Sequence, residues 1–97
     1  MRLDGRIAIV TGAGGGLGRQ HALFLARQGA RVVVNDMNAG AADAVAAEIK
    51  AAGGEAFGVG ASVTDEVAVQ AMVDRTLSEW GRVDILINNA GILRDKS

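Results

Sequence analysis

The chain has 97 residues, of which 49% are hydrophobic and 22% are charged, with a net charge of −1 and no Cys, Pro or Tyr. This composition predicts one globular domain rather than a disordered chain. The balanced charge, without basic clusters, argues against nucleic acid or a membrane surface as the partner. The absence of Cys excludes a disulfide framework and suits a cytoplasmic compartment. No apolar run approaches the roughly 20 residues of a membrane span, and the charges around Leu3 argue against a signal peptide.

The first half of the chain alternates short apolar runs with segments that favour a helix. Residues 7–10 are continuously apolar and precede a glycine cluster, which predicts a buried strand. A helix is expected over residues 17–28, with Gly29 as its C-terminal stop. The β-branched run within residues 31–35 predicts a second buried strand.

Two further helices and two further strands are expected after Asp36. Asn38 is placed to cap the second helix, which Gly53 and Gly54 end. Its expected apolar stripe is Ala41, Val45, Ile49 and Ala52. Residues 55–60 form a weaker third strand, with Phe57 and Val59 on one side.

The last predicted helix begins at Thr64 as its N-cap, with Asp65 and Glu66 near its positive end, and stops at Gly81. Its expected stripe is Val69, Met72, Val73, Thr76 and Trp80. Residues 83–88 then predict a fourth strand.

The resulting order, β-α-β-α-β-α-β, predicts an α/β fold with a parallel sheet flanked by helices. Right-handed crossovers place the first two helices on one face of the sheet. The third helix belongs on the other face if the chain forms a dinucleotide-binding half, and the strand order is then 3-2-1-4. This architecture is a partial Rossmann-type sheet.

A glycine-rich loop separates the first strand from the first helix. Such a loop lets backbone N–H groups approach a pyrophosphate at the start of a helix. A Walker loop does not fit, because Arg19 and Gln20 follow the last glycine, and G-x-G-x-x-G fails at Leu17. The pattern that fits is T-G-x-x-x-G-x-G. The alternative is a merely flexible loop. The candidate cofactor-binding residues are Gly12, Gly14, Gly15, Gly16, Leu17 and Gly18.

Asp36 ends the second strand, 18 residues after Gly18. A carboxylate there can accept hydrogen bonds from the hydroxyls of an adenosine ribose, and it would repel a 2′-phosphate. NAD is therefore favoured over NADP. The alternative is an ordinary Asp in a turn between a strand and a helix.

These residues together resemble the short-chain dehydrogenase/reductase family. The resemblance covers the whole chain, but only the cofactor-binding half of the family's domain, so residues 1–97 are expected to be the N-terminal part of one NAD-binding Rossmann domain. Four features carry it: the loop from Thr11 to Gly18, Asp36, Asp84 in the fourth strand, and the run Asn88-Asn89-Ala90-Gly91.

The resemblance implies further cofactor contacts. Ser62 and Val63 should lie beside the adenine, although many members carry Asp where Ser62 stands, and a serine hydroxyl can still bond the adenine edge. Asn89, Ala90 and Gly91 should line the ribose and the nicotinamide. Asn88 and Asn89 could instead tie a strand end to its neighbours.

The resemblance also implies a reaction and its limits. The segment from Gly91 to Ser97 looks like dehydrogenases of 3-hydroxyacyl-CoA thioesters, so the parent enzyme would move hydride between NAD and a secondary alcohol or ketone, as a homo-oligomer. The family's catalytic Ser, Tyr and Lys lie beyond the fourth strand. With no Tyr, the chain alone is expected to be inactive, and His21 is expected to pack on a helix face. The alternatives are a non-catalytic nucleotide-binding module and a truncated product.

Overall fold

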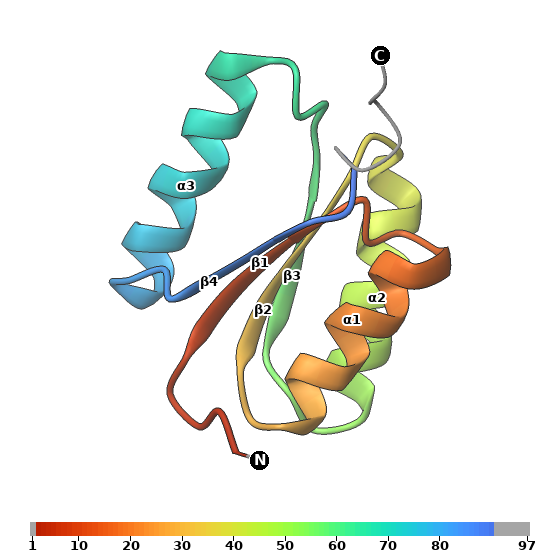
Figure 1. Cartoon of the computed structure of the whole chain (residues 1–97), viewed down its shortest axis with the longest axis vertical. Helices are drawn as coiled ribbons and strands as arrows, with labels where there is room; N and C mark the ends of the chain where they lie inside the picture. Colours follow the sequence, from red (N-terminus) through yellow and green to blue (C-terminus); the bar gives the residue numbers. More distant parts are fainter. Residues whose placement is uncertain (1, 91–97) are drawn as a thin grey trace.

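The structure is a computed structural model, and it describes residues 2–90. Three helices and four strands alternate along the chain (Figure 1). The strands are β1 (Ile7–Thr11), β2 (Arg31–Asp36), β3 (Ala56–Gly60) and β4 (Ile85–Asn88). The helices are α1 (Gly16–Arg27), α2 (Ala39–Ala51) and α3 (Glu66–Trp80). The predicted order of elements is confirmed.

All strand pairs are parallel and the order across the sheet is β3-β2-β1-β4, as predicted. The register places Val10 beside Val34 and Ile87, so the two central strands carry the apolar core. Figure 1 shows α1 and α2 on one face of the sheet and α3 on the other. Right-handed crossovers in opposite directions from β1 account for this arrangement.

The two faces of the sheet are covered unequally. On the side of α1 and α2, small and branched side chains form a large buried cluster that includes Ala8, Val34 and Ile49. On the side of α3, the buried cluster is Ile9, Val33 and Met72, with Phe57 and Val59 packed against it on the same side, as expected. Leu86 on β4 remains 63% exposed.

Three sequence expectations need correction. Thr64 does not cap α3, because its hydroxyl bonds Ser62, and Asp65 accepts from Ala68 N instead. In α2 the buried residues are Ala42, Val45, Ala46 and Ile49, whereas Ala52 is exposed at the helix end. The fourth strand begins at Ile85 rather than at residue 83. Its entry is fixed by Asp84, whose carboxylate accepts from Ile7 N at 2.9 Å.

Candidate functional site

The predicted site residues come together at the carboxyl ends of the four parallel strands. The glycine loop follows β1, Asp36 ends β2, Ser62 and Val63 follow β3, and Asn89 follows β4. In open α/β sheets, ligands bind along this edge, where the strand order reverses. Gly91 and the segment after it lie outside the described residues.

The glycine loop is held tightly against its surroundings. Gly12 and Gly16 have φ angles of +61° and +55°, which side chains rarely adopt. A Cβ on Gly12 would lie 3.0 Å from Ala90 N, and one on Gly18 would overlap the carbonyl of Gly12. The loop therefore has a defined conformation, which the interpretation as a merely flexible loop does not explain.

The amino end of α1 has no capping side chain. Its N-cap is Gly15, and no acidic residue stands in its first turn. By contrast, Asn38 caps α2 and Asp65 caps α3, each accepting a backbone N–H. The N–H groups that open α1 are therefore left for an anion, and the space around Gly15 and Gly16 is open. This arrangement fits a pyrophosphate.

Asp36 connects the loop to β2. Its Oδ2 accepts from Gly14 N at 2.9 Å and its Oδ1 accepts from Asn38 N at 3.0 Å. A carboxylate has roughly four acceptor positions, so about two remain for other donors such as ribose hydroxyls. A Cβ on Gly14 would lie 2.8 Å from both the Asp36 carboxyl carbon and Ala41 Cβ, so a side chain there would displace one of them.

The first basic residue after the loop is already paired. Arg19 donates from Nε and Nη2 to the two carboxylate oxygens of Glu48 on α2, at 2.9 and 2.6 Å. This hydrogen bond lowers the pKa of Glu48 below its usual value. Next to Asp36, the exposed Met37 offers no charge. Neither side chain is thus available to a 2′-phosphate, in agreement with the sequence argument for NAD.

The segment after β3 is fixed beside Asp36. Ala61 N donates to the Asp36 carbonyl at 3.0 Å, and Asn35 Nδ2 donates to the carbonyls of Val59 and Ala61. This role of Asn35 was not predicted; the available signal was a polar residue inside a buried strand. Val63 lines an apolar cleft of about 260 Å³ between α3 and the sheet.

The segment after β4 is tied to the end of β1 by Thr11. Its hydroxyl donates to Asn88 Oδ1 at 2.9 Å and accepts from Ala90 N at 3.3 Å. Asn88 thus ties the end of β4 to β1, which is the structural role that the sequence offered as an alternative to cofactor binding. Both amide atoms of Asn89 are buried without a partner among the described residues, so they fit a ligand that offers a donor and an acceptor. Thr11, the first residue of the motif, had been given no role.

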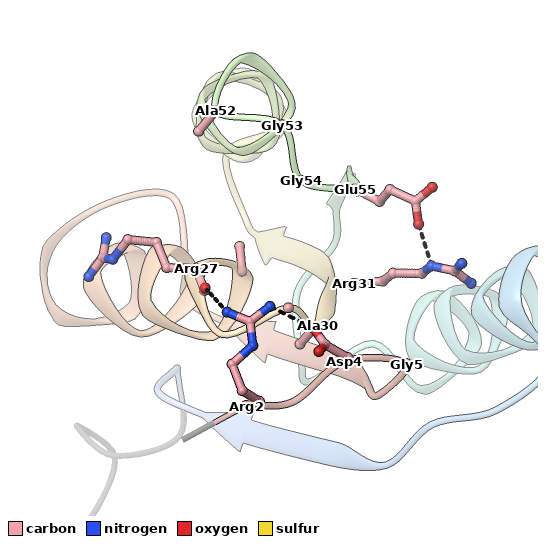
Figure 2. Close-up of a pocket in the computed structure, with 12 residues that line it drawn as sticks. Arg2, Asp4, Gly5, Arg27, Ala30, Arg31, Ala52, Gly53, Gly54 and Glu55 are labelled. Carbon is pink, nitrogen blue, oxygen red and sulfur yellow. Dashed lines mark hydrogen bonds and ion pairs between the residues drawn. The ribbon is translucent and has the colours of Figure 1, made fainter.

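A larger hollow lies elsewhere, at the amino ends of the strands (Figure 2). It measures about 730 Å³ and is lined by paired charges: Arg2 with Asp4, and Arg31 with Glu55. The helix ends that face it are the carboxyl ends of α1 and α2, which disfavour anions. A phosphate-containing ligand is therefore expected at the opposite edge, despite the smaller space there.

Two other classes of site find no support in residues 2–90. These residues contain no group of three or more potential metal ligands. None of their helices is both long and apolar enough to cross a membrane. His21 is half-buried on α1, and its Nδ1 has no partner among the described residues.

Comparison with known proteins identifies the family. Residues 6–97 match the family model for short chain dehydrogenases. The chain belongs to the short-chain dehydrogenase family, as its loop and fold had predicted.

Individual relatives are similar along nearly the whole chain. The chain is 51% identical to the peroxisomal multifunctional enzyme type 2 of Drosophila melanogaster, covering 100% of this chain and 17% of that protein. It is 50% identical to the 7alpha-hydroxysteroid dehydrogenase of Escherichia coli K12, covering 94% of this chain and 36% of that protein. The chain thus spans well under half the length of these relatives.

Solved structures of related proteins share the fold of this chain. A short chain dehydrogenase from Mycobacterium avium, 47% identical, superposes with a TM-score of 0.89 over 99% of this chain and 38% of its own. A 7 alpha-hydroxysteroid dehydrogenase complexed with NADH and 7-oxo glycochenodeoxycholic acid, 48% identical, superposes with a TM-score of 0.84 over 88% of this chain and 33% of its own. The partial Rossmann-type fold is confirmed.

Proposed function

We propose that this chain is the NAD-binding part of an oxidoreductase that moves hydride between the cofactor and a secondary alcohol or ketone. The observation that carries the proposal is the bond between the Asp36 carboxylate and Gly14 N. It sets a ribose-binding acceptor directly beside a loop and helix end suited to phosphate. The NADH complex of a 48% identical relative supports the same cofactor.

The residues of this chain bind and orient the cofactor. The N–H groups at the start of α1 hold the pyrophosphate, and Asp36 holds the adenosine ribose. The buried amide of Asn89 meets the polar groups at the nicotinamide end, next to β4. The nicotinamide supplies hydride chemistry when it is bound. The chain contains no Tyr, so the proton relay of the reaction has to come from other residues.

For the substrate class, we propose a 3-hydroxyacyl thioester. The similarity over the full chain to peroxisomal multifunctional enzymes supports this class, and a hydroxysteroid is the competing substrate because a 50% identical relative acts on one. In a longer protein that contains this chain, reduction of NAD with 3-hydroxyacyl-CoA but not with a bile acid is expected. The reverse preference would contradict the thioester proposal.

A binding module without catalysis is the second candidate, because the chain has a complete phosphate loop but no Tyr. Titration calorimetry with NAD and NADP tests the shared step of both candidates. NAD is expected to bind more tightly, by about tenfold or more, because Asp36 repels a 2′-phosphate. Equal dissociation constants would contradict the role of Asp36. Hydride transfer by a longer protein that contains this chain, followed by nicotinamide absorbance, separates the enzyme from the module.

A further inference from the structure

The pyrophosphate and ribose positions of the proposed function lie on different elements. The N–H groups that open α1 hold the pyrophosphate. Asp36 holds the ribose, and its carboxylate is fixed to the start of α2 because it accepts from Asn38 N. A dinucleotide spans both positions, so its affinity depends on how α1 is placed relative to α2. Side chains that fix this placement therefore contribute to binding without touching the cofactor.

Apolar packing between the two helices is incomplete toward their carboxyl ends. A cleft of about 130 Å³ remains there, and its lining includes Leu23 from α1 and Ile49 from α2. Side chains beside such a gap lack contact atoms on one side, so packing restrains the helices less there. In the described part of the chain, the hydrogen bonds between Arg19 and Glu48 are the only side-chain hydrogen bonds that join α1 to α2.

Arg19 belongs to the turn of α1 that carries the free donors. Its backbone N donates to the Gly15 carbonyl at 3.1 Å, which closes the first turn and leaves the N–H groups of residues 16–18 without an acceptor in the helix. Its guanidinium donates to both carboxylate oxygens of Glu48. A contact through two parallel hydrogen bonds defines an orientation as well as a distance.

We propose that Arg19 and Glu48 form a positioning pair, which holds the first turn of α1 where one ligand can reach both its free N–H groups and Asp36. This inference rests on the proposed function. The two side chains are 35% and 44% exposed, so breaking the pair should weaken NAD binding by about three- to fivefold rather than abolish it. Attraction through space predicts the opposite sign, because an unpaired Arg19 would draw the pyrophosphate more strongly.

Two variants test the pair by titration calorimetry with NAD. Glu48→Gln removes the carboxylate and makes the site more positive, whereas Arg19→Lys keeps the charge and loses the planar two-bond fork. Both variants should weaken NAD binding by about three- to fivefold. Glu55→Gln is the matched control, because it breaks an ion pair with Arg31 at the amino ends of the strands (Figure 2), and it should change the affinity by less than about twofold.

Ligands of different span separate positioning from a general loss of structure. ADP reaches both the free N–H groups and Asp36, whereas adenosine reaches Asp36 alone. In competition with NAD, Glu48→Gln should weaken ADP about as much as NAD, and adenosine by less than about twofold. An equal loss for ADP and adenosine would contradict positioning. Circular dichroism checks that each variant is folded.

The outcomes also separate this inference from the proposed function. If the wild type binds NAD but Glu48→Gln binds it equally or more tightly, the positioning proposal is wrong and NAD binding stands. The same conclusion follows if Arg19→Lys retains the wild-type affinity, since the charge alone would then be sufficient. If the wild type binds neither NAD nor ADP, the proposed function is wrong and the positioning proposal with it.

Discussion

Replacing Gly18 by Ala should damage both the fold and the binding site. Gly18 is buried in the first turn of α1, and a Cβ there would lie 2.7 Å from Gly12 C and 3.0 Å from Ala13 Cα. Both neighbours are backbone, so no side-chain rotation can relieve the overlap, and α1 must move away from the loop. The higher helix propensity of Ala stabilises the variant by up to about 1 kcal/mol, while overpacking destabilises it by about 1–3 kcal/mol or more. The expected net loss in unfolding free energy is about 1–2 kcal/mol.

Gly15→Ala is the matched control from the same loop. Gly15 is extended, with φ −173°, and an added Cβ meets nothing within 4 Å. Its unfolding free energy should stay within about 0.5 kcal/mol of wild type. Urea unfolding followed by circular dichroism measures stability, and calorimetry measures NAD affinity, which Gly18→Ala should reduce by roughly tenfold or more. If Gly18→Ala were instead more stable than wild type, the close contact between α1 and the loop would be refuted.

Three further predictions concern charge and exposure. Asp36→Ala removes the acceptor of both Gly14 N and Asn38 N, so NAD affinity should fall by roughly 10- to 100-fold in calorimetry, whereas Asp74→Ala on α3 should not change it. Hydrogen bonds from Arg82 and from Ile7 N lower the pKa of Asp84 in the folded state below its ordinary value of 3.8. The ionised carboxylate therefore stabilises the fold above that pH, and this stabilisation is lost as the pH falls through the folded-state pKa. Asp84→Asn should therefore lower the urea midpoint at about pH 7. The difference between the midpoints at about pH 7 and about pH 3 should be smaller in the variant than in the wild type, and an unchanged difference would contradict this. Leu86 is 63% exposed on β4, at the edge of the sheet, so the 97-residue chain should self-associate in sedimentation, and it should transfer no hydride. Leu86→Lys should shift the chain toward monomer. A wild-type chain that stays monomeric at all concentrations would show that this edge does not drive association.

The strands and helices could be predicted because they depend on local patterns, whereas the strand order and the helix faces followed from crossover handedness and the dinucleotide-binding topology. Val32, Val33 and Val34 are buried whichever partner they have, and the glycine spacing limits the turn between β1 and α1. The cap of α3 could not be chosen from sequence, because Thr64 and Asp65 are both good caps. The choice follows from Ser62, which bonds the Thr64 hydroxyl and leaves Asp65 to cap the helix.

The contacts that complete the candidate site were beyond sequence reasoning for a different reason. The bond from Gly14 N to Asp36 joins residues 22 positions apart, and the bond from Ala90 N to Thr11 joins residues 79 positions apart. Neither distance follows from periodicity, since each depends on how two strand ends are aligned in the sheet. Asp36 was named from the sequence as a candidate ribose-binding residue, but the sequence did not reveal that its carboxylate already holds the loop.

If Asp36 both anchors the loop and binds the ribose, as proposed, this pairing limits how coenzyme preference can evolve or be engineered. Exchanging the carboxylate for a neutral or basic side chain would remove the repulsion of a 2′-phosphate, yet the same step would release the amides of Gly14 and of Asn38, the N-cap of α2. A substitution at Asp36 would therefore change the preference for NAD and the anchoring of the loop at the same time. A successful switch to NADP in this chain requires a second substitution that supplies a new acceptor for the loop, so the shortest functional route has at least two steps.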